Sequence, residues 1–350
     1  MTVATIDVAM LSFGGPAATA DIGPFLEAMT GVAPGPETLA AVARRYDAIG
    51  GGSPLPETTR RQAAALEAAL VADLGVGVRV RPGFLYGTPS VADCLAGLDP
   101  RDTVVLPMSP YESRYTSGAY RAALAAAGRA DLTVVDGWFA DARYLAAVSR
   151  RVHAALDGAD TSELAMLFTA HNVPLETVAE GDPYVDQLQQ AIARLLPALT
   201  PGDWRLAFQS KGRHGGAWLE PEAASAVREL AAGGWRTLAV VPLGFVADNL
   251  ETLYDLDVEL RAVVEASGME LLRVPALNDE PAFMQALADI VIERLAHRPL
   301  TGPVDLGRGG PFGGGLFGGG LGGPFGAGSG DDGASGAPSG EGAGPSASGA

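Results

Sequence analysis

Short apolar runs alternate along the chain with longer segments in which apolar residues recur at helical spacing. Apolar runs placed between helical patterns are typical of buried parallel strands. We expect strands over Ile6–Phe13, Val78–Leu85, Thr103–Met108, Leu132–Val135, Leu164–Thr169, Arg205–Phe208, Thr237–Pro242 and Leu271–Val274. The amphipathic segments predict helices over Thr58–Leu74, Ala119–Ala127, Ala140–Leu156, Val185–Leu196 and Glu220–Ala232, and a last one from Pro281 to about His297.

Four strands in each half, joined by helix-length connections, predict an α/β protein with two doubly wound lobes. We expect a first lobe over residues 1–145, a second over 146–280, a closing helix over 281–299 and a Gly-rich tail over 300–350. The tail has no periodicity and cannot bury enough apolar surface to offset its ordering entropy, so it is predicted to be disordered. Two facing lobes would leave a cleft lined by their strand ends.

Composition narrows the class of protein. The formal charge of −17 argues against sequence-independent nucleic-acid binding, which depends on a basic surface. The single cysteine, Cys94, excludes an intrachain disulfide and an all-cysteine zinc or iron–sulfur site. The N-terminus lacks a basic signal region, and no apolar stretch approaches the roughly 20 residues of a membrane helix. We expect a cytoplasmic protein with no integral membrane contact.

His171 is the strongest candidate for chemistry, because it follows the strand predicted over Leu164–Thr169. In open α/β sheets, ligands bind at the carboxyl ends of such strands. A neutral imidazole there can accept a proton near pH 7 or bind a metal. The strand over Thr237–Pro242 leads into a segment that carries Glu251. A base and a carboxylate thus each follow the end of a predicted strand.

Three carboxylates, Glu251, Asp255 and Glu259, recur at every fourth residue. This spacing places them in one row along a helix face. A solvated acidic face is the usual explanation of such a row. The row starts near a strand end, however, which favours a role in guiding a divalent cation that oxygen ligands hold loosely.

Several residues beyond the first strands are candidates for binding a flat or anionic ligand. Arg45 can hold a carboxylate and Tyr46 adds a hydroxyl on an apolar ring, although a solvated helix end would look the same. Tyr120 belongs to an aromatic-rich stretch that fits a flat ligand or ordinary core packing. No strand is followed by GxGxxG, and the Gly-rich turn ending in Ser53 lacks the P-loop lysine, so nucleotide binding is disfavoured.

Residues 5 to 297 resemble the ferrochelatase family from end to end. The resemblance rests on several motifs in the same order: LSFGGP (11–16), RRYDAIGGGSPL (44–55), AHNVP (170–174), GDPYVDQL (181–188), FQSKGRHGGAWLEP (208–221), GFVADNLETLYDLD (244–257) and a closing LND with its helix. It implies two similar Rossmann-like lobes, each with a four-stranded parallel sheet flanked by helices, and a porphyrin cleft between them. It also implies insertion of Fe²⁺ into a porphyrin, with the metal as substrate and no permanently bound cofactor.

The resemblance assigns roles to individual residues. His171 and Glu251 would face the metal and carry the catalysis. Asp255 and Glu259 match a row proposed to lead metal or protons to the site. The residues that would contact the porphyrin and its propionates are Phe13, Arg45, Tyr46, Ser53 and Tyr120.

The GDPYVDQL stretch and the QS…WL-P loop look closest to enzymes of Gram-positive bacteria and their relatives, which act on coproporphyrin III. We therefore expect coproporphyrin III and Fe²⁺ as substrates, Fe-coproporphyrin and two protons as products, and transient contact with other haem-pathway enzymes. A protoporphyrin IX ferrochelatase, a cobalt or nickel chelatase and a non-catalytic haem or porphyrin carrier stay open as alternatives.

Three departures from the family pattern stand out. Asn249 occupies a place where many relatives have a histidine, and an amide cannot take a proton or ligate iron well. Phe13 occupies a place where some relatives have a tyrosine that can ligate product iron. Some actinobacterial relatives carry a [2Fe–2S] cluster, which the lone cysteine excludes here.

Overall fold

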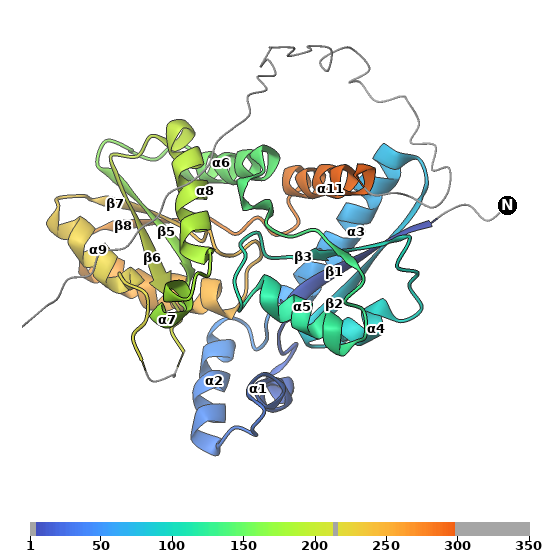
Figure 1. Cartoon of the computed structure of the whole chain (residues 1–350). Coiled ribbons are helices and arrows are strands. Elements are labelled where there is room, and N and C mark those ends of the chain that lie inside the picture. The colour runs from blue at the N-terminus through green and yellow to red at the C-terminus, as the bar shows by residue number, and fades with distance from the viewer. Residues whose placement is uncertain (1–4, 213–215, 298–350) are drawn as a thin grey trace, which may run out of the picture. The chain divides into compact units, whose positions relative to one another are not determined.

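Each half of the chain builds one four-stranded parallel sheet, and the two sheets share the same strand order (Figure 1). The structure is a computed structural model that describes residues 5–212 and 216–297. The first sheet has the order β2-β1-β3-β4, with β1 (Thr5–Gly14), β2 (Gly77–Tyr86), β3 (Thr103–Pro107) and β4 (Thr133–Val134). The second has the order β6-β5-β7-β8, with β5 (Leu164–His171), β6 (Asp203–Gln209), β7 (Thr237–Val241) and β8 (Glu270–Arg273). The predicted fold class and strands are confirmed.

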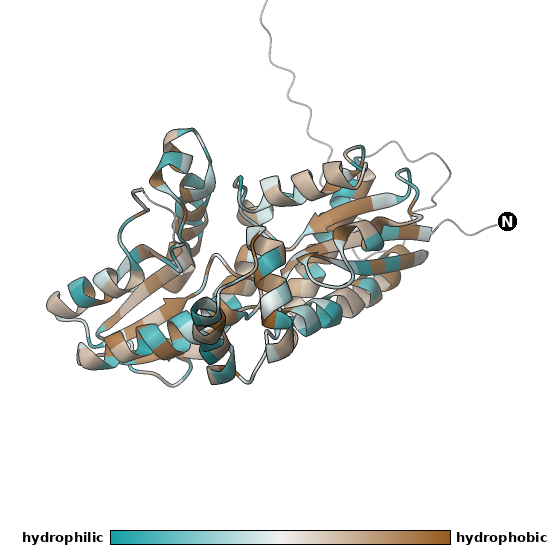
Figure 2. Ribbon diagram, turned by 90° about the horizontal axis from the view of Figure 1, so that it is seen from below, coloured by the Kyte–Doolittle hydropathy of each residue, from teal (hydrophilic) through white to brown (hydrophobic). Residues whose placement is uncertain are grey.

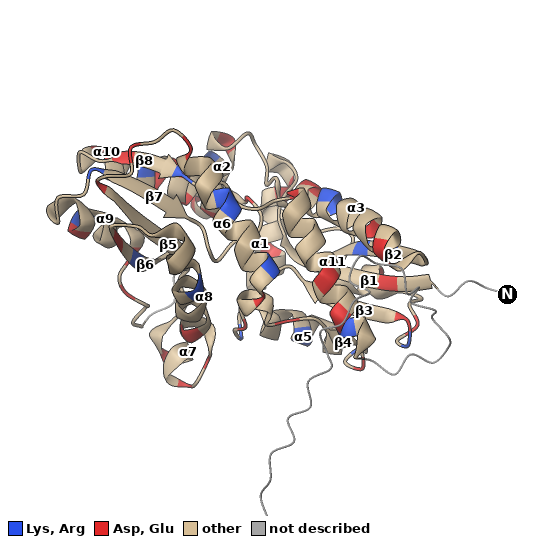
Figure 3. Ribbon diagram, turned by 90° about the horizontal axis from the view of Figure 1, so that it is seen from above, with Lys and Arg blue, Asp and Glu red and all other residues tan. Residues whose placement is uncertain are grey.

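The central strands are apolar because helices cover the sheets. β3 and β7 are buried at every position, as continuous apolar runs in parallel sheets require. Figure 2 shows the strands of both sheets as predominantly hydrophobic ribbons, and Figure 3 shows most charged residues on helices and loops. β5 is buried from Leu164 to Ala170 and becomes accessible only at His171. The polar end of this strand therefore lies at the edge of the core.

The predicted helices are confirmed, with small shifts at their ends. They are α3 (Leu55–Leu74), α5 (Ser117–Ala126), α6 (Ala142–Leu156), α8 (Tyr184–Leu199), α9 (Ala223–Ala232) and α11 (Pro281–Ala296). The prediction missed α1 (Ile22–Thr30), α2 (Pro36–Ala48), α4 (Val91–Leu95), α7 (Leu175–Ala179) and the short 3₁₀ turns at Thr19–Asp21 and Trp138–Ala140. α1 and α2 lie side by side, away from the sheets (Figure 1), and bury only Ile22, Leu26 and Tyr46. With so few buried positions, they add little to the core.

A π-helix (Glu251–Leu260) continues into α10 (Arg261–Ala266). The sequence predicts a helix here, but with ordinary α-helical spacing, and that part of the prediction is wrong. At the end of the π-helix, the N–H of Arg261 donates to the carbonyl of Leu256, five residues earlier. The three carboxylates predicted to form one row have different surroundings: Glu251 is half-buried, Asp255 is buried and Glu259 is exposed.

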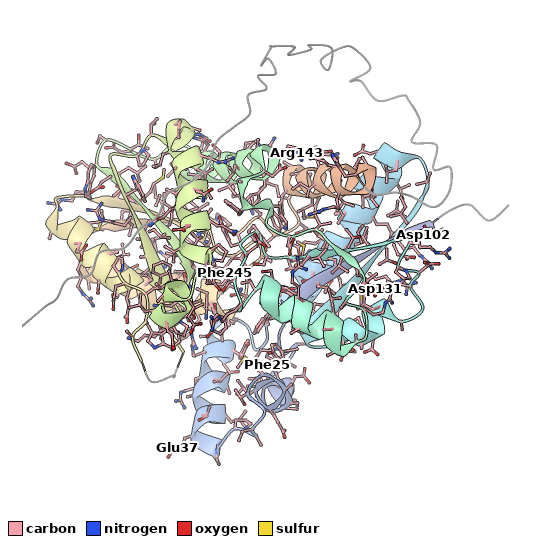
Figure 4. The ribbon with its side chains drawn as sticks, in the orientation of Figure 1. Phe25, Glu37, Asp102, Asp131, Arg143 and Phe245 are labelled. Carbon is pink, nitrogen blue, oxygen red and sulfur yellow. The ribbon has the colours of Figure 1, made fainter. Side chains whose placement is uncertain are left out.

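The closing helix α11 packs against α3 and α6. The Gln62 side chain on α3 donates to the carbonyl of Asn278, just before α11, with a distance of 2.8 Å. Arg143 on α6 reaches Glu293 on α11 (2.9 Å), near the position labelled in Figure 4. The predicted boundary between residues 145 and 146 falls inside α6, and residues 5–297 lie within one compact unit. The predicted tail over 300–350 lies outside the described residues.

The GDPYVDQL stretch connects the two halves. The Asp182 carboxylate accepts hydrogen bonds from the Ser113 hydroxyl (3.0 Å) and the Arg114 N–H (2.8 Å). The Gln187 side chain accepts from the N–H of Glu112 (2.7 Å) and donates to its carboxylate (3.0 Å). This motif thus holds the loop between β3 and α5 against the start of α8.

Candidate active site

His171 and Glu251 form a hydrogen-bonded pair at the carboxyl end of the second sheet. His171 is the last residue of β5, and Glu251 is the first residue of the π-helix that follows β7. His171 Nδ1 lies 2.9 Å from Glu251 Oε2, and the two side chains are 41% and 32% exposed. Both are therefore accessible from solvent while contacting each other.

Gly244 lets the loop after β7 pass close to β5. A Cβ at this position would lie 2.8 Å from the Cα of Ala170, far inside van der Waals contact. The N–H of Gly244 donates to the carbonyl of Thr169 (3.0 Å). Gly244 thus brings the loop after β7 close to His171, and this loop leads to Glu251.

The charge state of His171 depends on its surroundings. Partial burial lowers the pKa of the imidazole, but the Glu251 charge, the hydrogen bond to Glu251 and the Asp255 charge together outweigh that effect. The net result is a pKa above the usual histidine value. The pair therefore favours the protonated ring more than an isolated histidine does.

Arg45 and Asp255 form an ion pair beside the His171–Glu251 pair. Asp255 also accepts a hydrogen bond from the Ser210 hydroxyl, and the Arg45 guanidinium lies 4.8 Å from the centre of the Tyr254 ring. Burial and the Glu251 charge raise the pKa of Asp255, whereas Ser210 and Arg45 lower it, and the net direction is upward. Arg45, predicted to hold a propionate, and Asp255, predicted to guide metal or protons, are thus partners of each other in this structure.

Tyr46 lies near Glu251 and Arg45, whereas Ser53 contacts the turn that follows β1. Tyr46 is buried in a small cluster with Ile22 and Leu26, against which Phe25 and Leu250 pack. Burial and the nearby Glu251 charge raise its pKa. The N–H of Ser53 donates to the Pro16 carbonyl (2.8 Å), and its hydroxyl accepts from the Leu55 N–H (3.3 Å).

Phe13 lies near the end of β1 and is 40% exposed. It belongs to an aromatic cluster with Phe25 and Tyr86, whose ring centres lie 5.0 to 6.4 Å apart in edge-to-face contacts. Figure 4 labels Phe25 on α1. Because Phe25 also packs against the Tyr46 cluster, a chain of apolar contacts leads from Phe13 to Leu250, the neighbour of Glu251.

Two predicted site residues lie in other surroundings. Tyr120 is buried in the core of the first sheet with Leu11 and Leu124, so its contact with a substrate stays a prediction. Glu259 is exposed near the end of the π-helix, and its role in a metal or proton path also stays a prediction.

The sequence reasoning missed several polar residues next to His171. Gln209, at the end of β6, is paired in register with His171, and its side chain donates to the Glu251 carbonyl (2.8 Å). The pKa of buried Tyr184 is raised by burial and the Glu251 charge, and a hydrogen bond with the His171 backbone opposes this. Asn172 makes two hydrogen bonds of 3.0 Å with the backbone of Leu219. Each stands in a motif singled out above, but no local pattern reveals which group it contacts.

Within residues 5–212 and 216–297, no group of three or more His, Cys, Asp or Glu side chains is arranged to hold a metal ion. No helix in the same ranges is both long enough and apolar enough to cross a membrane.

Comparison with known proteins identifies relatives that are ferrochelatases. The Ferrochelatase family model matches residues 6–295. The ferrochelatase of Rippkaea orientalis is 36% identical over 271 residues, which cover 73% of this chain and 69% of the relative. The ferrochelatase of Herpetosiphon aurantiacus is 32% identical over 278 residues, covering 76% of this chain and 91% of the relative. These relatives do not resolve the expected Gram-positive subtype.

Solved structures agree on the fold. SirB from Bacillus subtilis, determined with Fe³⁺, superposes with a TM-score of 0.51 at 12% identity, covering 83% of this chain and 95% of that chain. DR2241 from Deinococcus radiodurans, a multi-domain protein with structural similarity to chelatases, gives a TM-score of 0.50 at 13% identity and covers 83% of this chain and 54% of that chain. At such identities the likeness concerns the fold alone. With the family model spanning nearly all described residues and relatives more than 30% identical, this chain belongs to the ferrochelatase family of porphyrin metal chelatases.

Proposed function

We propose that this member of the family inserts Fe²⁺ into coproporphyrin III, giving Fe-coproporphyrin and two protons. The choice of porphyrin is supported by the GDPYVDQL stretch (181–188) and the loop over 208–221, which look closest to enzymes that act on coproporphyrin III. The reaction type is supported by the family and by the His171–Glu251 pair. That pair is the observation that carries the mechanism.

His171 is the base that removes the pyrrole protons. With Nδ1 donating its hydrogen to the Glu251 carboxylate, the neutral ring keeps a free lone pair on Nε2. This tautomer is inferred from the hydrogen bond. A porphyrin N–H gives its proton to Nε2, and Glu251 stabilises the imidazolium that forms. The ring, which is 41% exposed, then releases this proton to water and can accept the second. The raised pKa of His171 favours this acceptance near neutral pH.

Glu251 has a second task, because Fe²⁺ must lose water before it enters the macrocycle. A carboxylate is a good oxygen ligand and can exchange with water on the metal. Its side chain is 32% exposed, so an arriving ion can reach it. His171 and Glu251 are thus our proposed metal contacts as well as the proton-handling pair.

Arg45 links porphyrin binding to the state of Asp255. A substrate propionate offers Arg45 a second carboxylate in place of Asp255, its partner in the structure. Coproporphyrin III carries four such groups. Binding through Arg45 would leave Asp255 with Ser210 as its remaining hydrogen-bond donor and free one of its oxygens beside Glu251.

The test is anaerobic incubation of the purified protein with Fe²⁺ and either coproporphyrin III or protoporphyrin IX, following the Soret band. We expect metallation of both to be measurable and coproporphyrin III to have the higher kcat/KM. A higher kcat/KM for protoporphyrin IX would show that the substrate choice is wrong. Tight haem binding without metallation of either porphyrin would show instead a carrier that lacks the activity.

A further inference from the structure

Asn249, one of the departures from the family pattern, caps the helix that carries Glu251. Its Oδ1 accepts hydrogen bonds from the N–H groups of Glu251 (2.8 Å) and Thr252 (3.2 Å). In return, the Asn249 N–H donates to the Thr252 hydroxyl (3.0 Å). This reciprocal arrangement is a capping box, and asparagine is among the best capping residues, which histidine is not. The side chain thus satisfies backbone donors that have no partner within the first turn.

Gln209 contacts the backbone of Glu251 at its carbonyl group. Its Nε2 donates to the Glu251 carbonyl (2.8 Å), and it is only 7% exposed. Its own backbone is paired with His171, and its carbonyl accepts from the Asn172 N–H (2.7 Å). Gln209 therefore connects the end of β5, where the base lies, to the start of the π-helix, where the carboxylate lies.

We propose that Asn249 and Gln209 are positioning residues that hold the Glu251 backbone at its N–H and its C=O and so keep its carboxylate on Nδ1 of His171. The inference rests on the proposed function, because it concerns how that proton-handling pair is kept in register. The two residues act through Glu251 and do not touch the reacting atoms. Outer partners of a metal-handling carboxylate commonly change activity by roughly 10–100-fold when removed.

A direct role for the Asn249 amide on the metal is the competing explanation, and one pair of variants separates the two. Asn249→Ala removes the cap, whereas Asn249→Ser keeps a capping oxygen and loses the amide. We expect Asn249→Ala to lower kcat for metallation about tenfold or more, with KM for porphyrin and for Fe²⁺ within about twofold of the wild-type values. Asn249→Ser should recover most of kcat. A raised KM for Fe²⁺ that serine does not restore would overturn the proposal.

Gln209→Met tests the second contact, because methionine has a similar length and no donor. We expect a loss of kcat with unchanged KM, and unchanged kcat would remove Gln209 from the proposal. Asp141→Ala is the matched control, since Asp141 caps α6 through the N–H groups of Arg143 and Tyr144. It should lower the Tm without lowering kcat. Equal kcat losses for Asn249→Ala and Asp141→Ala would mean that only general stability is affected.

The same measurements distinguish failure of this inference from failure of the proposed function. If the unmodified protein metallates neither porphyrin, the proposed function is wrong. If it metallates porphyrin and all three variants at Asn249 and Gln209 keep the wild-type kcat, the function stands and the positioning role is wrong.

Discussion

The carboxyl ends of β1 and β5 occupy equivalent places in two sheets of the same strand order, yet they carry different chemistry. Phe13 stands near the end of β1 among the rings of Phe25 and Tyr86. His171 ends β5 and contacts Glu251, with Gln209 alongside. The same strand order thus ends once in a cluster of aromatic rings and once in a hydrogen-bonded imidazole and carboxylate. The difference shows that equivalent strand ends in the two sheets can carry unlike side chains, and we propose that one binds porphyrin while the other handles protons.

Replacing His171 should give the largest effect and test the reactive side of this comparison. We expect His171→Ala to lower kcat by roughly 10²–10⁴-fold, because the base is lost. Porphyrin binding, measured by fluorescence quenching, should change little. His153→Ala, at an exposed position of α6, is the matched control and should keep wild-type activity. Appreciable turnover by His171→Ala would remove His171 from its proposed role.

Replacing the partner of His171 should give a smaller loss and a change in pH dependence. A base must be neutral to act, so activity should fall as the pH drops through the raised pKa of His171. Glu251→Gln removes the charge that raises this pKa and leaves the lowering effect of burial, so the acidic limb should move to lower pH. kcat should also fall, by roughly 10–100-fold. A pH–rate profile with an unmoved acidic limb would contradict the proposed coupling.

Replacing Phe13 tests the apolar side. Phe13→Ala removes an exposed ring from the aromatic cluster and should raise KM for porphyrin roughly tenfold, which corresponds to about 1.4 kcal/mol of binding. kcat should stay close to that of the unmodified protein. The KM of Phe13→Leu for porphyrin should lie between those of Phe13→Ala and the unmodified protein. A loss confined to kcat would show that the two strand ends do not divide the work in this way.

The smallest effect should come from replacing Asp141, the cap of α6. Burial raises the pKa of Asp141, but hydrogen bonds from Arg143 and its charge lower it more, so the net direction is downward. The stabilisation is therefore present above the pKa of an unfolded aspartate, about 3.9, and is lost as the pH falls through the lower folded value. Asp141→Ala should cost about 1 kcal/mol of unfolding free energy at pH 7. Denaturant unfolding at pH 7 and below pH 3 checks this, and an equal cost at both pH values would contradict it.

Much of the fold could be predicted because the central strands are continuous apolar runs and the main helices have one apolar face. The π-helix could not be predicted, because apolar spacing does not show whether each N–H donates to the carbonyl four residues earlier or five residues earlier. α1 and α2 were not predicted, and they bury only three side chains between them. For the site, the strand-end position of His171 was visible in the sequence. In the sequence Asn249 stands out only as a departure from the family pattern, and its capping role becomes visible only in the folded structure.

The sequence by itself determined the order of strands and helices and placed His171 and Glu251 after two strands, because neighbouring residues encode these features. Tertiary structure decided which groups meet. His171 and Glu251 are 80 positions apart, and Arg45 and Asp255 are 210 apart. Such pairs form only when sheet register and loop packing, here the close approach at Gly244, bring distant segments together. The chemistry of each residue is local, whereas its partner is a property of the whole fold.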